Sequence, residues 1–426
     1  MLEFTCLGCQ VKRITRTLLA RVKSTLDWSP VVFVEGPRQT GKTVLVRDML
    51  GALREATYVT FDDMTALAAV KSDPQGYVLS FFGPVSFDEA QRVPEIVLPI
   101  KLSVDRERTP GRFVLTGSAR IRFLRGAGDS LAGRAVALTL WPLSQGELAG
   151  VRERFVDHVF AGGSFAHGTA QLRDIELVDR LVRGGYPQSV LSRSPHERSE
   201  WARQLVRAIV EQDVRDVVPI SDTANMLQFV LYLAASSAEL TNMDKAARDL
   251  GMVSVTLSRY LDLLEMVFLV QRIRPWRGNH AKRLVKSPKV LFVDTGLACA
   301  VMNADVAQLQ DDRPLFGRML ESFVGMELVK QFGWSEGAYT LMHYRDHAGV
   351  EVDWVIERAD GKVVGIEVKS TTSPGPDDFK GMRSFARAAG DRFVGGVVLH
   401  AGDTTLKMGE KMWALPVDAL WGDYPA

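Results

Sequence analysis

The sequence predicts an α/β protein with three parts, namely an N-terminal α/β domain, a helical middle and a small C-terminal α/β domain. Three observations predict it. Near the N-terminus a short apolar run is followed by a glycine-bounded loop and a helical pattern. In the middle, apolar residues recur at helix spacing. Near the C-terminus, apolar and polar residues alternate as they do in half-buried strands.

The composition bounds the class of protein. With 426 residues, of which 46% are hydrophobic and 24% charged, the chain has ordinary globular composition and room for two to four domains. Lysine and arginine number 52 against 51 aspartate and glutamate residues, so the chain as a whole has no field that attracts nucleic acid. Any contact with DNA must therefore come from a local basic patch.

The cysteines and the apolar segments predict a soluble protein of the cytoplasm, without a membrane partner. Cys6, Cys9 and Cys299 are too few for a disulfide framework, which suits a reducing compartment. No second ligand pair follows the C-x-x-C pair at zinc-site spacing, so we interpret that pair as part of a plain N-terminal extension rather than a metal or redox site. No apolar run approaches the length of a membrane span, and basic residues interrupt the N-terminus where a signal peptide would be apolar.

The first predicted strand leads into a glycine-bounded loop. Val31–Val34 is a short apolar run that predicts a buried strand, and Val44–Leu50 continues after the loop as a helix. This order gives the G-x-x-x-x-G-K-[ST] pattern its meaning, because the glycines let amide N–H groups converge on phosphate oxygens at a helix N-terminus. We expect Lys42 to reach the β- and γ-phosphates of ATP and the Thr43 hydroxyl to bind Mg²⁺. The predicted nucleotide-binding residues are Gly36, Pro37, Arg38, Gln39, Thr40, Gly41, Lys42, Thr43 and Val44.

A second strand supplies the acids that such a loop requires. The segment Val85–Ala90 ends in an Asp-Glu pair. Asp88 at the strand end is expected to hold Mg²⁺, directly or through water. Glu89 is expected to polarise the attacking water, because hydrolysis needs a base in line with the γ-phosphate. Without the loop before it, the pair would be interpreted as an acidic turn after a strand.

Further catalytic candidates follow a third strand, Phe113–Leu115. Thr116 and Ser118 at its end are candidates for sensing the γ-phosphate, and the alternative is an ordinary strand-end turn. Arg134 is a candidate arginine finger, supplied in cis or by a neighbouring subunit of a homo-oligomer, with Arg120 as its rival. Either arginine is otherwise a surface or structural residue.

The middle of the chain is predicted to be helical. From Asp174 to about Val218, apolar residues recur at helix spacing between charges of both signs, which predicts a lid or connector without a catalytic site. Met243–Val270 predicts a helix-turn-helix with Gly251 in its turn, followed by the first strand of a wing at Phe268–Val270. A winged helix either places its second helix in a DNA groove or serves as an internal packing and dimerisation module.

A basic segment follows over residues 272–289. Such charges favour phosphate contacts, so DNA is the partner expected if this module binds one. Aromatic interleaving is thin, with only Trp276, and a charge run is otherwise a solvated face. The basic residues are Arg272, Arg274, Arg277, His280, Lys282, Arg283, Lys286 and Lys289.

Two alternating segments predict adjacent strands near the C-terminus, Val350–Ile356 and Val363–Lys369. The register depends on the turn between them. A three-residue loop that ends at Gly361, the common type I turn with glycine in the left-handed position, sets Asp353 opposite Glu367. Because the side-chain period is two, Glu367 and the lysine two residues further on share one face, and the aspartate meets them there.

Aspartate followed by Glu-x-Lys on an adjacent strand is the core of the PD-(D/E)XK nuclease fold. Asp353 and Glu367 would bind Mg²⁺, and Lys369 would orient or activate a water for phosphodiester cleavage. Glu321, on a helix expected to begin near Arg318, matches the acid that often precedes this motif. The alternative is a surface ion pair on an edge strand, or a nuclease-like fold without activity.

In this order, the motifs resemble a family, the bacterial and archaeal AAA-type ATPases whose C-terminal half is a domain of unknown function. The resemblance covers the chain beyond about the first ten residues and implies an ATPase whose cellular role is poorly defined. One departure is the strand before Asp88, which is less apolar than usual, although the Asp-Glu pair is intact. The shared motifs are Gly36–Thr43, Phe87–Gln91, Leu115–Ser118, Leu131–Arg134, Trp141–Ser144, Gly184–Pro187, Asp294–Leu297 and Glu367–Ser370.

These predictions combine into one organisation. We expect an N-terminal extension and helix (1–24), an AAA-type P-loop domain (25–165), a helical lid or connector (166–235), a winged-helix-like domain (236–284) and a PD-(D/E)XK nuclease-like domain (285–426). The predicted function is hydrolysis of ATP coupled to a C-terminal nuclease-like domain that acts on DNA. The alternative is that ATP drives a conformational switch and the C-terminal domain is a non-catalytic binding or assembly module.

Overall fold

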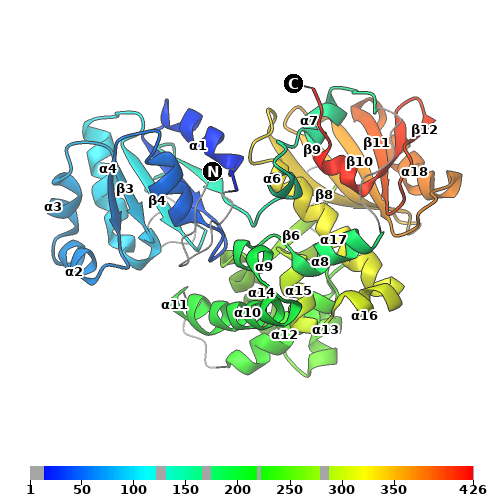
Figure 1. Cartoon of the computed structure of the whole chain (residues 1–426), viewed down its shortest axis with the longest axis horizontal. Helices are drawn as coiled ribbons and strands as arrows, with labels where there is room; N and C mark the ends of the chain where they lie inside the picture. Colours follow the sequence, from blue (N-terminus) through cyan, green and yellow to red (C-terminus); the bar gives the residue numbers. More distant parts are fainter. Residues whose placement is uncertain (1–13, 121–130, 166–173, 218–221, 279–286, 426) are drawn as a thin grey trace. The chain divides into compact units, whose positions relative to one another are not determined.

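A computed structural model describes residues 14–120, 131–165, 174–217, 222–278 and 287–425 (Figure 1). The chain divides into two compact units. The first comprises Met1–Leu143 together with Met266–Phe268, and the second comprises Ser144–Glu265 with Leu269–Ala426. The first boundary thus falls at Leu143 rather than at the predicted residue 165. The two helices that follow it, α6 (Gln145–Ala149) and α7 (Phe155–Phe160), belong to the second unit.

The first unit is built on a five-stranded parallel sheet in the order β2-β3-β4-β1-β5. In a parallel sheet the carboxyl ends of all strands meet at one edge. Strand β4 lies between β1 and β3, so the loops after these three strands are neighbours at that edge. The strands are β1 (Val31–Glu35), β2 (Thr57–Thr60), β3 (Val85–Asp88), β4 (Phe113–Gly117) and β5 (Ala135–Thr139).

Helices cover both faces of this sheet (Figure 1). Val32 and Val34 of β1 pack in the core with α1 and η1, whereas Val31 and Phe33 face the core under α3 and α4. This alternation follows from the period of two in a strand, and burial on both faces explains why β1 is apolar throughout. The helices are α1 (Leu18–Leu26), η1 (Val44–Leu50, with i+5 hydrogen bonding), α2 (Met64–Ser72), α3 (Pro74–Leu79) and α4 (Val97–Arg106), with short η2 (Ala90–Arg92) and η3 (Pro94–Ile96).

Helix α15 (Thr295–Met302) is the centre of the helical part of the second unit. Helices α8, α10 and α12 all pack against it. The predicted boundaries at 235 and 284 therefore differ from the packing, because a helix expected in the nuclease-like domain forms one core with the predicted connector. The other helices here are α8 (Asp174–Arg183), α9 (Pro187–Leu191), α10 (Pro195–Ala208), η5 (Ile209–Asp213), α11 (Val214–Val217), α12 (Thr223–Ala235) and α16 (Val306–Asp311).

Two of the motifs named in the sequence analysis, Gly184–Pro187 and Asp294–Leu297, contact each other in this core. Asp294 caps α15, because its carboxylate accepts hydrogen bonds from the Leu297 N–H (3.0 Å) and from the Gly185 N–H (2.7 Å). Gly184 has φ +65°, and a Cβ there would lie 2.2 Å from the Asp294 carboxylate. These motifs are thus explained by chain packing.

The predicted helix-turn-helix is formed by α13 (Met243–Leu250) and α14 (Ser254–Met266), with Gly251 between them at φ +65°. The strand expected to begin a separate wing has other partners in the structure. Its strand, β6 (Val270–Pro275), pairs antiparallel with β7 (Lys289–Phe292) and parallel with β8. Both strands therefore extend the C-terminal sheet, which satisfies the backbone groups that a separate wing would leave at its edge.

The C-terminal sheet has eight strands in the order β12-β13-β11-β10-β9-β8-β6-β7. Helix α17 packs on β7, β8 and β10, and α18 packs on β9, β10 and β11. Helix α17 begins at Arg313 rather than near Arg318, because Asp312 caps it through the Leu315 N–H. The elements are β8 (Tyr339–Arg345), β9 (Glu351–Arg358), β10 (Val363–Lys369), β11 (Phe393–His400), β12 (Leu406–Gly409), β13 (Met412–Pro416), α6 (Gln145–Ala149), α7 (Phe155–Phe160), α17 (Arg313–Gln331), α18 (Lys380–Ala389), η7 (Pro376–Phe379), η8 (Gly390–Arg392) and η9 (Val417–Trp421).

The register of β9 and β10 follows the turn chemistry read from the sequence. Glu357 pairs with Val363, and residues 359–361 form the loop, with Gly361 at φ +82°. The paired ladder ends at Ile366 opposite Trp354. The next position on each strand would place Asp353 opposite Glu367, as predicted, but the strands separate there. Asp353 lies in the opening.

Buried carboxylates also fix α6. The Gly146 N–H donates to Glu153 Oε1 (2.7 Å), and the Gln145 N–H donates to Glu327 Oε2 (2.9 Å). Burial, and then the nearby Glu327 charge, raise the pKa of Glu153 to about 7.

Over the described part of the chain, no helix combines the length and the apolar character that a membrane crossing requires.

Candidate functional site

The glycine-bounded loop lies at the carboxyl edge of the first sheet, between β1 and η1. Gly36 and Gly41 have φ of +152° and +92°, and a Cβ on Gly36 would lie 2.3 Å from the Leu140 carbonyl oxygen. The buried Lys42 ammonium donates to the carbonyl oxygens of Gly36 (3.0 Å) and Pro37 (2.8 Å). The loop therefore encloses its lysine, as a phosphate-binding loop requires.

Arg16, just before α1, fixes this loop from outside the motif. Its side chain is buried and donates through Nη1 to the Thr40 carbonyl (2.6 Å) and through Nη2 to the Trp141 carbonyl (2.6 Å). No local sequence pattern connects Arg16 with Thr40, because the two residues are 24 positions apart in the chain.

Asp88 is the centre of the polar network at this edge. Thr43 Oγ1 donates to Asp88 Oδ2 at 2.9 Å, so the two predicted Mg²⁺ ligands are adjacent. Tyr58 on β2 donates to the same oxygen at 2.7 Å, and the Thr116 hydroxyl donates to the other carboxylate oxygen. Burial, and then the Asp88 carboxylate, raise the pKa of Tyr58, which keeps its hydroxyl a donor. Tyr58 was not among the predicted site residues.

Glu89 has an unusual backbone. Its φ of +57° is in the left-handed region, which residues other than glycine rarely adopt. Its N–H donates to Thr116 Oγ1 (3.0 Å), and its carboxylate accepts from the amide of Gln91, which also donates to Ser118 Oγ (3.0 Å). Thr116 thus contacts the Asp88-Glu89 pair directly, whereas Ser118 is linked to Glu89 through Gln91. Backbone strain such as that at Glu89 occurs at functional sites.

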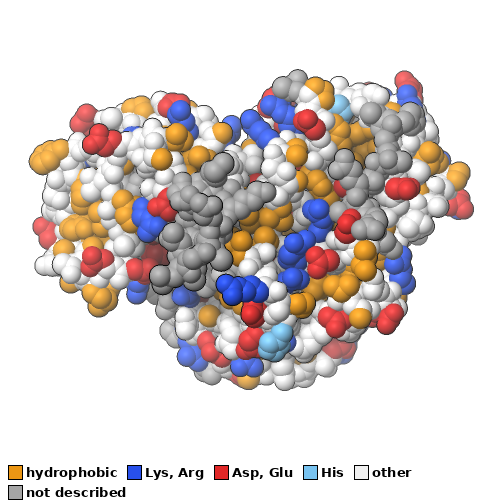
Figure 2. All heavy atoms as spheres, viewed as in Figure 1, with side chains coloured by type: hydrophobic (Ala, Val, Ile, Leu, Met, Phe, Trp, Pro, Cys, Tyr) orange, Lys and Arg blue, Asp and Glu red, His pale blue; other side chains and the backbone are white. Residues whose placement is uncertain are grey.

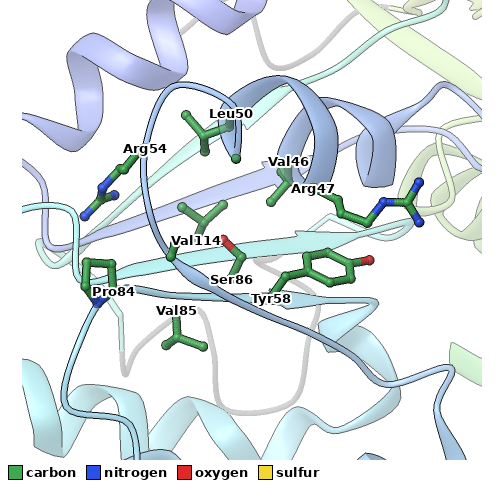
Figure 3. A pocket seen from close by; sticks show the side chains of 11 residues that line it. Val46, Arg47, Leu50, Arg54, Tyr58, Pro84, Val85, Ser86 and Val114 are labelled. Carbon is green, nitrogen blue, oxygen red and sulfur yellow. The ribbon is translucent and has the colours of Figure 1, made fainter. Parts of the chain in front are cut away.

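A small cavity lies behind the loop, under η1 (Figure 3). Its volume of about 30 Å³ suffices for a water molecule rather than a nucleotide. Val46 and Leu50 line it from the helix, while Ser86 and Val114 line it from the sheet. The cavity thus lies between part of η1 and strands β3 and β4 and is not the nucleotide site.

The two candidate arginine fingers lie at different edges of the sheet. Arg134 comes just before β5, whose first residue pairs with Val31, the first residue of β1. It forms an ion pair with Asp105 (2.5 Å). Five strand residues, roughly 17 Å, separate this end of the sheet from the phosphate loop, so Arg134 lies far from its own loop. Arg120 follows β4 at the carboxyl edge, and its guanidinium lies over the Phe268 ring (4.8 Å).

A second charged cluster lies where β9 and β10 separate. Lys289 on β7 contacts Glu321 Oε1 on α17 (2.5 Å) and Asp353 Oδ1 on β9 (3.7 Å). The Val368 N–H donates to Asp353 Oδ2 (2.8 Å). Trp354 donates to the Glu321 carbonyl (3.2 Å), which ties β9 to α17.

The other predicted members of this cluster complete it. Lys369 donates to Glu367 Oε1 at 2.8 Å. Burial and the Asp353 charge raise the pKa of Glu367 and also of Glu321. Burial by itself would lower the pKa of Lys289, but the Glu321 and Asp353 carboxylates outweigh it and raise the pKa. The cluster thus joins three acids to two lysines, of which Lys289 was not predicted here.

The acids of this cluster do not fit a divalent cation as they are arranged. Within the described ranges, no group of three His, Cys, Asp or Glu side chains has the geometry of a metal site. The Lys289 ammonium, rather than open space, lies beside Glu321 and Asp353. A metal ion and this ammonium would compete for the same oxygens.

In the described part of the basic segment, Arg272 and Lys289 are paired with acids. Arg272 pairs with Asp262 (2.8 Å) and Glu265 (2.5 Å), Lys289 is buried in the cluster, and Trp276 is buried against aromatic rings. In Figure 2, acidic side chains lie among the basic ones on the visible face. His280, Lys282, Arg283 and Lys286 lie outside the described residues.

The cysteines carry no site in the described chain. Cys6 and Cys9 lie outside the described residues. Cys299 is a free thiol buried in α15, and burial raises its pKa to about 12. A thiol with so high a pKa is unreactive at neutral pH.

Models of three protein families match three successive segments of the chain. The model of an AAA domain matches residues 29–149, and models of two domains of unknown function, DUF8612 and DUF4143, match residues 175–308 and 316–420. Uncharacterized proteins of Mycobacterium tuberculosis and Mycobacterium bovis are each 30% identical over 413 residues, covering 95% of this chain and 84% of theirs. An uncharacterized protein of Haemophilus influenzae is 25% identical over 365 residues, covering 78% of this chain and 81% of its own.

Some solved structures match this chain at lower sequence identity. A Walker-type ATPase of Pyrococcus abyssi is 12% identical with a TM-score of 0.40, covering 67% of this chain and 94% of its own. AMPPCP-bound DnaA from Aquifex aeolicus is 14% identical with a TM-score of 0.28, covering 57% of this chain and 86% of its own.

Proposed function

This chain belongs to the family of AAA-domain proteins that includes the two mycobacterial relatives, and we propose that it hydrolyses ATP at the phosphate loop. One observation carries the proposal. Thr43 and Asp88, on two motifs separated in the sequence, are 2.9 Å apart between Oγ1 and Oδ2. These are the two residue types that hold the nucleotide's Mg²⁺ in P-loop enzymes.

Each residue of the loop edge then has a role. Lys42 leaves the Gly36 and Pro37 carbonyls and donates to the phosphates, because anionic oxygens are stronger acceptors than neutral carbonyls. Thr43 and Asp88 would hold Mg²⁺, which would supply neutralisation of developing charge on the phosphates.

Glu89 is the residue for orienting and deprotonating the attacking water. The Glu89 carboxylate accepts a hydrogen bond from Gln91, which also contacts Ser118. Thr116 contacts both the Glu89 N–H and the Asp88 carboxylate. A rearrangement at Thr116, or at Ser118 through Gln91, would therefore reach the base, which supports their role as γ-phosphate sensors.

Two substitutions test this proposal. Lys42→Ala is expected to abolish ATP binding, and Glu89→Gln is expected to retain ATP and lose turnover at least about a hundredfold. Nucleotide retention by filter binding and phosphate release measure the two effects. Lys71→Ala and Glu95→Gln are matched controls, because both side chains are exposed in the same unit. Full turnover in the Lys42 and Glu89 variants would refute the assignment.

For the second unit, we propose the non-catalytic alternative, in which ATP drives a conformational switch. Met266–Phe268 belongs to the first unit although the chain on both sides of it belongs to the second. The Arg120 N–H donates to the Met266 carbonyl (3.2 Å), and Phe268 packs edge-to-face on Trp141 (5.6 Å). Arg120 lies shortly after the end of β4, the strand that carries Thr116. A shift of β4 on hydrolysis would therefore move Met266–Phe268, which is continuous in the chain with α14 and β6.

The competing reading is a nuclease gated by ATP. A plasmid incubated with the protein, ATP and Mg²⁺ or Mn²⁺ distinguishes the two. We expect no cleavage by the wild-type chain. Cleavage that Lys369→Ala removes would establish the nuclease and sink the switch-only proposal, whereas cleavage that persists in Lys369→Ala would indicate a contaminant. DNA binding without cleavage, through α14, is compatible with the switch and is measured by a mobility shift.

A further inference from the structure

We propose that Lys289 is the resident cation of the C-terminal carboxylate cluster and takes the place that a divalent metal ion would occupy. The inference concerns the second unit and does not depend on ATP hydrolysis. It gives the cluster a structural role, tying α17, β7 and β9 together, in place of a Mg²⁺-dependent role.

The contacts of Lys289 carry this inference. Its ammonium is 2.5 Å from Glu321 Oε1 and 3.7 Å from Asp353 Oδ1, and the side chain is 7% exposed. An ammonium can donate three hydrogen bonds and has no acceptor, so it offers carboxylates what a hard cation offers, with one positive charge. It also lies 5.0 Å from the centroid of the Trp354 ring, whose π face favours a cation.

The third acid is compensated separately. Glu367 pairs with Lys369 at 2.8 Å, and its other oxygen, Oε2, is buried without a hydrogen-bond partner in the described chain. Glu321, Asp353 and Glu367 would carry three negative charges, against two positive charges on the lysines. The cluster is therefore nearly neutral already, so it gains little from recruiting a doubly charged ion into a buried site.

Removing the ammonium should create the metal site that it fills. Lys289→Met keeps the length of the apolar stem and leaves Glu321 and Asp353 without a cation. Carboxylate oxygens suit Mn²⁺, Mg²⁺ and Tb³⁺, all hard ions. Trp354 provides the readout, because Tb³⁺ bound where the ammonium lies would be near its ring and would luminesce on excitation of tryptophan.

The experiment uses the full chain without nucleotide. In wild type we expect no saturable Tb³⁺ luminescence that depends on Glu321. In Lys289→Met we expect a saturable signal, displaced by Mn²⁺, with apparent affinity at least about tenfold above wild type. Adding Glu321→Gln to Lys289→Met should remove it.

Lys407→Met is the matched control. Lys407 also lies over a tryptophan, with its Nζ 5.6 Å from the Trp413 ring, but on an exposed strand. We expect this variant to bind Tb³⁺ no better than wild type. An equal gain in both methionine variants would overturn the proposal, because it would show that loss of any lysine near tryptophan suffices.

A second measurement does not require the Lys289 variant to fold. Millimolar Mn²⁺ should shift the melting temperature of wild type no more than that of Glu321→Gln, because both proteins keep the phosphate-loop site. A larger rise in wild type would mean that the cluster binds metal with Lys289 present, and would overturn the inference. Equal shifts support it. If Lys289→Met folds only when Mn²⁺ is added, the substitution of ammonium for metal is supported directly.

Discussion

Replacing Arg16 by alanine is expected to weaken ATP binding, although Arg16 lies outside the glycine-bounded motif. The buried guanidinium links the Thr40 and Trp141 carbonyls, at 2.6 Å each. A hydrogen bond to a charged group contributes about 1.5–3 kcal/mol, so losing two costs about 3–6 kcal/mol before water and neighbouring groups relax. We expect a net loss of about 3 kcal/mol, a large part of the stability of an ordinary domain.

Part of that loss should appear as weaker binding. If about half of it reflects the freedom that the loop regains around Thr40, the affinity for ATP falls about tenfold, since 1.4 kcal/mol is a factor of ten. A fluorescent ATP analogue measures the dissociation constant, and a thermal melt measures the stability. Arg16→Lys should lie between wild type and Arg16→Ala, because one ammonium cannot reproduce the fork of a guanidinium.

Arg21→Ala is the matched control, since Arg21 is an exposed arginine on α1, the helix that follows Arg16. It should leave both the dissociation constant and the melting temperature unchanged. The reasoning would be refuted if Arg16→Ala bound ATP as tightly as Arg21→Ala while melting at the same temperature. A lower melting temperature with unchanged affinity would limit the role of Arg16 to stability and would equally contradict the predicted fixing of the loop.

Four further predictions follow from single contacts. Tyr58→Phe removes one donor to Asp88 and should change the affinity for Mg²⁺-ATP by a few fold while keeping the fold, as measured by titrating Mg²⁺ in the hydrolysis assay. Gly36→Ala should abolish nucleotide binding, because its Cβ would meet the Leu140 carbonyl; wild-type binding would contradict this. Arg134→Ala should leave single-subunit turnover unchanged, and a rate loss that mixing with Lys42→Ala protein restores would identify a finger acting in trans. The pKa of Glu153 is about 7 in the native state, against an ordinary value of 4.5. The free energy of unfolding should therefore fall by ~3 kcal/mol as the pH rises between these two values. Glu153→Gln should flatten that fall, as measured by urea titrations at pH 5 and pH 8.

The sequence predicted those parts of the site that local patterns encode. The phosphate loop could be read from its own residues, because glycines at fixed offsets between an apolar run and a helix have few other uses. The register of β9 and β10 was predicted for a similar reason. The backbone of Gly361, at φ +82°, fixes the loop length, and loop length fixes which residues pair.

The partners of those residues could not be read in this way. Arg16, Tyr58 and Lys289 each meet a predicted site residue across a long stretch of chain, and no spacing rule connects them. Lys289 was instead grouped with the basic segment, because charge along a sequence does not reveal burial. The domain boundaries failed for a related reason, since an apolar helix such as Thr295–Met302 does not indicate which neighbours will bury it.

The contrast between the two acid sites of this chain explains why similar residue patterns lead to different chemistry. The donors to the Asp88 carboxylate in the described chain are the hydroxyls of Thr43, Tyr58 and Thr116, which are neutral. Neutral donors orient a carboxylate without forming an ion pair with it, so the carboxylate still attracts a divalent cation. Glu321, in contrast, already contacts the Lys289 ammonium. A cation arriving there must displace a buried charge that would itself lose its partner, and breaking such a pair costs about 3–5 kcal/mol. The same ion is therefore expected to bind at the first site and to be excluded from the second.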